Sequence, residues 1–191
     1  MLIYSKCMAG IYRYANYTEK NPLKSTVISS SLIMSCGDYI MQKFEKSQLT
    51  IVDKIKWKLD TLRLKNMAIY GLISGTISYC WYIRLLPKLV YSKTQTKIME
   101  TGKKLILDQF AFTPIYYLMF LYSVTRLDGK NHSDGKDKIY KDFYRCFIMD
   151  LKVWPILQTL NFYFLPNHLQ VVFITSEMVF WSAYLSHVKN T

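Results

Sequence analysis

The chain reads LILDQFAFTPIYYLMFLYSVT from residue 105 to residue 125, which is 21 consecutive positions without a Lys or Arg. A membrane-spanning helix needs about 20 mostly apolar residues, because the hydrocarbon core is about 30 Å thick and each helical residue rises about 1.5 Å. This stretch therefore has the length and composition of one span.

Three other stretches also lack basic side chains: residues 25–42, 66–83 and 153–188. The first two are close to the length of one span, and the third holds one span with about 16 residues to spare. The four stretches together contain none of the 25 Lys and Arg residues. The sequence therefore predicts an all-α integral membrane bundle with four transmembrane spans, in a single membrane domain over residues 1–191.

Most of the positive charge lies in the connecting loops, predicted at residues 43–65, 84–104 and 126–152. A nucleic-acid-binding protein would gather its charge on one face and present it through a recognisable motif. Here the net charge of +12 is spread over all the connections. This distribution favours anionic lipid head groups as partners and argues against nucleic acid.

Two connections carry local signals of their own. Residues 51–64 alternate apolar and charged side chains at helical spacing, which predicts an amphipathic helix at the membrane interface. Residues 126–152 contain the turn signals Asp128-Gly129 and Asp134-Gly135, which predict a solvated loop.

Residues with chemical reactivity form no recognisable constellation. The four Cys and three His residues are scattered without the spacing of a disulfide framework or metal site. The chain has no phosphate-binding glycine loop and no nucleophile elbow. We therefore predict no catalytic, cofactor or metal site, and expect a protein that is not an enzyme.

Polar side chains share one face of the first stretch. Ser31, Ser35, Asp38 and Gln42 step by four, three and four residues, which places them together on a helix. A charge that faces lipid costs several kcal/mol at least, so this face should point toward protein or water.

The second stretch has a face of small residues that includes Gly71-x-x-x-Gly75. Small residues at this spacing let two helix backbones approach closely in a membrane, so we expect tight helix packing there. The stretch closes with Trp81 and Tyr82, aromatic residues that are typical of a membrane–water interface.

The third stretch has Asp108 and Gln109 near its start and Pro114 inside it. Pro114 should bend the helix, because proline removes a backbone hydrogen bond. Asp108 has two interpretations. It is an acid in the first turn of a helix, favoured by the helix dipole, or it faces an internal aqueous path.

The last stretch sets aromatic, proline and amide residues in a definite order. Gln158 and Asn161 share a helix face with Trp154, and two amides in an apolar segment must find partners or water. The ordered set is Trp154, Pro155, Gln158, Asn161, Phe162, Pro166, Trp181, Tyr184, Leu185 and Ser186.

This ordered set closely resembles the signature of the Mpv17/PMP22 family, small four-span proteins of the mitochondrial inner membrane and the peroxisomal membrane. The resemblance continues upstream and covers nearly the whole chain, through Gly37-Asp38, Gln42, Asp60, Arg63, Gly71, Gly75, Trp81-Tyr82, Leu107-Asp108-Gln109 and Pro114. There are departures from the family pattern. Thr76 and Gln170 replace a Pro and an Arg, Tyr79 replaces a His, and Ser182 replaces an Asn. Without that Arg, Glu177 lacks the partner that the resemblance implies, and we expect it to stay protonated or to face water.

The resemblance implies a pore or channel for small solutes or ions, associated with metabolite balance and mitochondrial homeostasis. It implies the mitochondrial inner membrane, with the peroxisomal membrane as the alternative, and it allows a homo-oligomer. Asp38, Asp108 and Glu177 are the acids of the four stretches, and no basic residue within the stretches offsets them, so a path that they line should prefer cations.

Two other classes of function stay open. The same polar residues could join helices through interhelical hydrogen bonds, each worth about 0.6 kcal/mol on average, and conduct nothing. The basic loops could instead serve a membrane scaffold for other proteins. The candidate pore-lining or helix-packing residues are Ser31, Ser35, Asp38, Gln42, Asp108, Gln109, Gln158, Asn161 and Glu177.

Overall fold

The computed structural model describes residues 2–165, 173–174, 177, 179–185 and 188, with side chains from residue 10 onward. The signature positions Pro166 and Ser186 lie outside the described residues, as does Gln170. Within the described part of the chain every regular element is a helix, which confirms the all-α prediction. The elements are α1 (Leu2–Lys20), α2 (Pro22–Ser47), α3 (Ile51–Lys56), α4 (Thr61–Ser78), the π-helical η1 (Tyr79–Leu85), α5 (Leu86–Val90), α6 (Lys97–Leu107), the π-helical η2 (Asp108–Phe112), α7 (Thr113–Leu127) and α8 (His132–Phe164).

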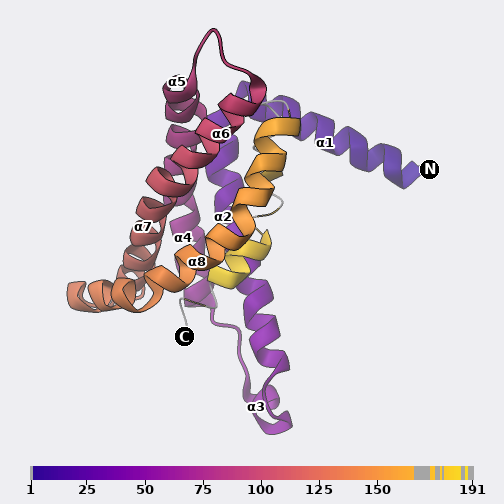
Figure 1. Cartoon of the computed structure of the whole chain (residues 1–191). Helices are drawn as coiled ribbons and strands as arrows, with labels where there is room; N and C mark the ends of the chain where they lie inside the picture. The colour runs from indigo at the N-terminus through magenta and orange to yellow at the C-terminus, as the bar shows by residue number, and fades with distance from the viewer. Residues whose placement is uncertain (1, 166–172, 175–176, 178, 186–187, 189–191) are drawn as a thin grey trace.

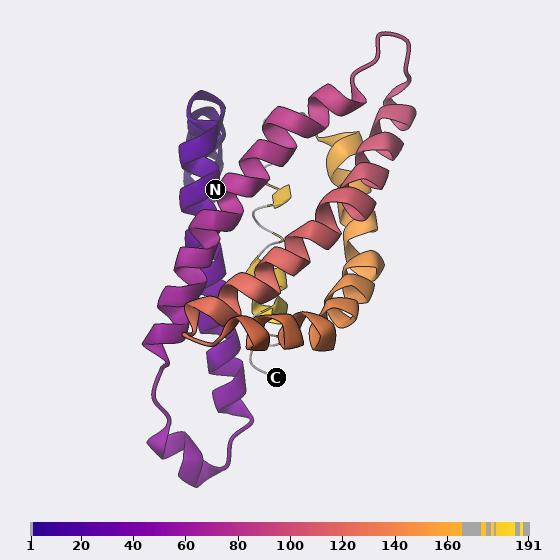
Figure 2. The ribbon, with the colours of Figure 1, turned by 90° about the vertical axis from the view of Figure 1, so that its left-hand side faces the viewer.

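Two long antiparallel rods form the centre of the bundle (Figures 1 and 2). One rod is α4, η1 and α5, and the other is α6, η2 and α7; residues 91–96 join them at one end. Helix α2 packs along α4, and α8 packs against α6 and α7. The short α3 lies at the end opposite the 91–96 connection, and α1 projects away from the bundle (Figure 1).

One described helix is long and apolar enough to cross a membrane by length and composition. It is the rod Lys97–Leu127, with 31 residues, which contains the stretch 105–125. The stretches 25–42 and 66–83 are also helical, but their many Ser, Thr and Gly residues dilute the apolar character of α2 and α4. The four-span arrangement therefore stays a prediction.

Three predictions about the connections need correction. The loop predicted at residues 84–104 is mostly helical, and only residues 91–96 lie between α5 and α6. Residues 132–152 are helical rather than a solvated loop, because the Asp134 carboxylate accepts a hydrogen bond of 2.8 Å from the Asn131 backbone N–H and caps α8. A turn occurs before it, where Gly129 has a φ of 78°. The interfacial helix predicted over 51–64 is limited to α3.

Helix α3 ends at Lys56, because the backbone of Trp57 is extended, and Asp60 is the N-cap of the next helix, α4. Its carboxylate accepts a hydrogen bond of 2.9 Å from the backbone N–H of Arg63.

Small residues hold α2 and α4 in close contact. A Cβ atom on Gly71 would lie 2.5 Å from the Cα of Ser31 and 2.7 Å from the carbonyl oxygen of Ser30. A Cβ atom on Gly75 would lie 2.8 Å from the Cα of Val27. The two glycines therefore let the backbones approach to a distance that alanine at the same positions would prevent.

Candidate functional site

Two π-helical turns face the interior of the bundle, one in each rod. Each turn is followed by a helix whose first turn contains a proline, Pro87 after η1 and Pro114 after η2. Proline removes one backbone hydrogen bond and clashes with the preceding turn, and the widened turn accommodates both effects. The structure thus places a π-helical turn, η2, directly before the helix that begins with Thr113-Pro114.

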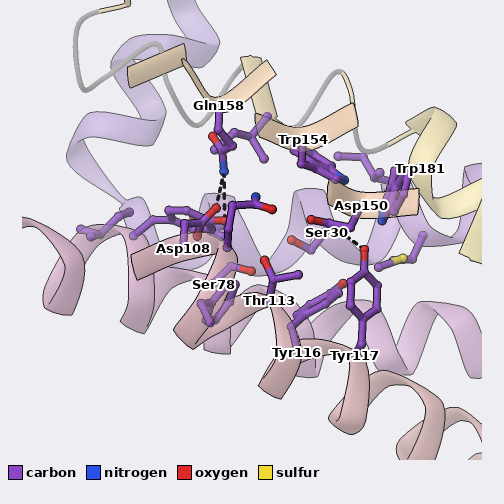
Figure 3. A pocket seen from close by; sticks show the side chains of 18 residues that line it. Ser30, Ser78, Asp108, Thr113, Tyr116, Tyr117, Asp150, Trp154, Gln158 and Trp181 are labelled. Carbon is purple, nitrogen blue, oxygen red and sulfur yellow. Dashed lines mark hydrogen bonds between the residues drawn. The ribbon is translucent and has the colours of Figure 1, made fainter. Parts of the chain in front are cut away.

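The side chain of Asp108, in η2, is held between the two rods and α8. The indole Nε1 of Trp81 donates a hydrogen bond of 2.9 Å to Oδ1, and the Gln158 amide Nε2 donates one of 2.9 Å to Oδ2 (Figure 3). The Trp81 ring stacks on Phe112 with a centroid distance of 5.0 Å and an interplanar angle of 8°. Asp108 is 2% exposed, and both of these donors are uncharged.

The two amide residues of α8, Gln158 and Asn161, are linked to Asp108 through hydrogen bonds. The Asn161 amide Nδ2 donates a hydrogen bond of 3.1 Å to Gln158 Oε1, which leaves the Gln158 N–H₂ group to face Asp108 and, at 3.2 Å, the hydroxyl of Tyr82. Trp81 and Tyr82, expected as markers of the membrane interface, therefore belong to this buried site. Local spacing could not show this, because their partners come from other helices.

A cavity of about 100 Å³ opens between these helices. Its wall combines hydroxyl, carboxyl and amide groups with aromatic rings contributed by α2, both rods, α8 and the carboxy-terminal segment (Figure 3). Of the sequence candidates it includes Asp108, Gln109 and Gln158, together with the signature residues Tyr82, Trp154 and Trp181. None of its described lining residues is basic.

A second acid, Asp150, lines the same cavity and was missed by the sequence reasoning. It is 4% exposed, and its Oδ1 accepts a hydrogen bond of 2.6 Å from the hydroxyl of Tyr117 (Figure 3). Asp150 lies just before the stretch 153–188, so it fell in the predicted loop. Its spacing of four residues from Trp154, and of eight from Gln158, places it on their helix face and could have revealed it.

Two tryptophans close the wall beside Asp150. The rings of Trp154 and Trp181 meet edge to face, with centroids 5.9 Å apart at 84°. Trp181 lies in turn against Tyr184, at a centroid distance of 5.0 Å. The carboxy-terminal part of the chain thus takes part in the cavity as well as in the apolar core.

Comparisons with known proteins identify the family to which this chain belongs. The model of the Mpv17 / PMP22 family matches residues 125–186. PXMP2/4 family protein 3 of Dictyostelium discoideum is 30% identical over 173 residues, which cover 91% of this chain and 87% of the relative. The chain belongs to the Mpv17/PMP22 family. The mitochondrial inner membrane protein Mpv17 of Danio rerio is 29% identical over 185 residues, covering 96% and 99%. Protein SYM1 of Debaryomyces hansenii is 28% identical over 195 residues, covering 96% and 90%. No solved structure matches this chain.

One departure from the Mpv17/PMP22 pattern has a clear structural setting. Ser182, which stands where the family usually has Asn, is buried. Its hydroxyl lies 2.9 Å from the carbonyl oxygen of Val179 and 3.2 Å from that of Ile33, and its one hydrogen is shared between the two acceptors. Ser182 lies directly against Gly37, where any Cβ atom would collide with its hydroxyl. The smaller side chain therefore serves as a contact between α2 and the carboxy-terminal segment.

Four other residues of the Mpv17/PMP22 signature lie away from the cavity: Asp38, Gln42, Asp60 and Arg63. Together with Glu45 they form a group that we call the polar clamp. Arg63 Nε lies 2.6 Å from Asp38 Oδ1, and Arg63 Nη1 lies 2.8 Å from Glu45 Oε2. Gln42 donates to Asp38 at 2.9 Å and accepts at 2.8 Å from the backbone N–H of Asp60. The clamp ties α2 to the start of α4.

The polar clamp supplies a base from outside the four stretches that offsets the acid of the first stretch. Arg63 lies just before the second stretch and reaches back to Asp38, which is 0% exposed. Burial alone would lower the pKa of Arg63, but its hydrogen bonds and charge interactions with Glu45 and Asp38 outweigh that effect and raise the pKa. The guanidinium therefore stays charged, and Asp38 is part of a helix contact rather than the wall of the cavity.

The remaining candidates are placed as follows. The Ser31 hydroxyl donates a hydrogen bond of 2.9 Å to the carbonyl oxygen of Ala68 in α4, and the Ser35 hydroxyl donates one of 2.9 Å to that of Ser31. Glu177 is half-buried. Among the described residues no group of His, Cys, Asp and Glu has the arrangement of a metal site.

Proposed function

We propose that this chain is a multi-pass protein of the mitochondrial inner membrane that forms a pore for small solutes and prefers cations. The observation that carries the proposal is the pair of buried acids, Asp108 and Asp150, on one cavity whose described wall has no base. Ionisable groups inside a membrane protein are costly and commonly mark a path for ions or substrates. The name of the Danio rerio relative supports the location, with the peroxisomal membrane as the alternative.

Neutralising each of the two acids, with the reversal potential measured in a salt gradient, tests this preference. A unit charge about 4 Å from a passing ion is worth about 1 kcal/mol in water and about 4 kcal/mol at an effective dielectric constant of about 20. We therefore expect Asp108→Asn and Asp150→Asn each to reduce the ratio of cation to anion permeability about fivefold or more. The measurement is the reversal potential of single-channel current in planar bilayers that separate two salt concentrations.

A matched control makes the same chemical change outside the cavity. Asp53 is on the exposed α3, so Asp53→Asn should leave the permeability ratio unchanged. Equal ratios in all four proteins would show that the two cavity acids are not on the conduction path.

The second candidate is a non-conducting structural protein or membrane scaffold. The polar clamp favours it, because an acid first considered for a pore is used there to join two helices. A silent bilayer, with the folded protein shown to be inserted, would support this alternative over the pore.

A further inference from the structure

Three buried oxygen atoms on the cavity wall have no hydrogen-bond partner among the described residues. They are Oδ2 of Asp150, Oε1 of Gln109 and the hydroxyl oxygen of Tyr116, whose residues are 4%, 3% and 9% exposed. Buried polar atoms in folded proteins nearly always have a partner. The carboxylate and amide oxygens only accept hydrogen bonds, and the hydroxyl can either donate or accept, so a hydrogen-bond donor is the partner that suits all three.

The charge of the side chains on the cavity wall indicates whether the missing hydrogen-bond donor is neutral or positively charged. Asp108 receives hydrogen bonds from Trp81 and Gln158 and lies beside the Tyr82 hydroxyl, and Asp150 receives one from Tyr117 and lies beside the Gln109 amide. All of these groups are uncharged. No Lys, Arg or His is among the described lining residues. A buried carboxylate is stabilised far better by a cation than by neutral donors alone, so the donor that fits best carries positive charge.

The aromatic rings favour an organic cation over a metal ion. The rings on the wall belong to Tyr82, Phe112, Tyr116, Tyr117, Trp154 and Trp181. Ring faces attract ammonium groups, and rings also bury apolar carbon. The described residues offer no group of metal ligands, and hard divalent ions take oxygen ligands in larger numbers than these three oxygen atoms provide.

The size of the cavity limits the ligand to a few heavy atoms. Its volume is about 100 Å³, whereas an engineered cavity of about 150 Å³ admits benzene. We propose that this cavity binds one small primary alkylammonium ion. Its –NH₃⁺ group supplies three donors and no acceptor, for Asp150, Gln109 and Asp108, and its carbon atoms pack on the Trp154 and Trp181 rings. The inference names the solute class of the pore proposed above and rests on that function.

Direct binding to the purified full-length chain in detergent micelles tests this inference without any need for conduction. Ethylammonium chloride is titrated by calorimetry, with sodium chloride at equal ionic strength and ethanol as the charged and the neutral references. We expect saturable binding of ethylammonium alone. Asp150→Asn should weaken it at least about tenfold, because the variant keeps the shape of the side chain and removes its charge. Asp53→Asn, on the exposed α3, should leave it unchanged.

A size series on the unmodified protein gives a second measurement that needs no variant. Methylammonium and ethylammonium should compete for one site, and tetraethylammonium, which has no N–H donor and exceeds the cavity, should not. Loss of saturable binding for every amine in folded protein would overturn the inference and indicate that water alone occupies the cavity. Equal affinity in the Asp150→Asn variant would also overturn it. A protein that binds ethylammonium in micelles yet stays silent in bilayers would retain the site and refute the pore.

Discussion

Replacing Arg63 with Met is expected to lower the free energy of unfolding by about 3–5 kcal/mol, the usual result of removing one partner from a buried ion pair. Met keeps most of the apolar stem of Arg but removes the guanidinium. Asp38, which is 0% exposed, then loses the cation that lies 2.6 Å from it. The measurement is an equilibrium unfolding titration of the purified protein in mixed micelles, followed by tryptophan fluorescence.

The same replacement at Arg13 is the control. Arg13 is exposed on α1, which projects from the bundle, so Arg13→Met should change the free energy by no more than about 0.5 kcal/mol. The double variant Asp38→Leu with Arg63→Met should recover much of the loss, because removing both partners leaves no unpaired buried charge. If the Arg63 and Arg13 variants unfold alike, the polar clamp does not stabilise the contact between α2 and α4.

The polar clamp also shows why the contact between Asp38 and Arg63 could not be predicted from the sequence. The stripe of Ser31, Ser35, Asp38 and Gln42 depends only on helical spacing, and the structure does place these residues in one helix, α2. The partner of Asp38 is Arg63, 25 positions away. Which side chain reaches across to which is decided by how two helices pack, and no local pattern contains that information.

In the cavity, some residues could be predicted from the sequence, but their partners could not. Asp108 and the amides of α8 were predictable as polar interruptions of apolar stretches, because burying them requires partners. That Gln158 is the partner of Asp108, across 50 positions, was not predictable. Asp150 was missed for a different reason. The absence of basic residues identifies apolar segments but not helix ends, and α8 begins 21 positions before the apolar stretch, at His132.

Changing Gly71 to Ala is expected to lower the free energy of unfolding by about 1–3 kcal/mol, the usual range for overpacking in a well-packed interior. The new Cβ atom would lie 2.5 Å from the Cα of Ser31 and 2.7 Å from the carbonyl oxygen of Ser30. Both are backbone atoms of α2, so relief requires the helices to separate rather than a side chain to rotate. Equilibrium unfolding in mixed micelles measures the loss.

The opposite result is expected for the same change at Gly102. This glycine lies inside α6, and a Cβ atom there would meet nothing within 4 Å. Gly102→Ala should therefore stabilise the protein by about 0.5–1 kcal/mol, since Ala loses less conformational freedom than Gly in a helix. The opposite signs of the two changes in unfolding free energy distinguish the effect of packing at Gly71 from the effect of helix propensity at Gly102. If Gly71→Ala also proved stabilising, α2 and α4 would not approach as closely as the structure shows, and Ser30, which lies on both the helix contact and the cavity wall, could not hold its place there.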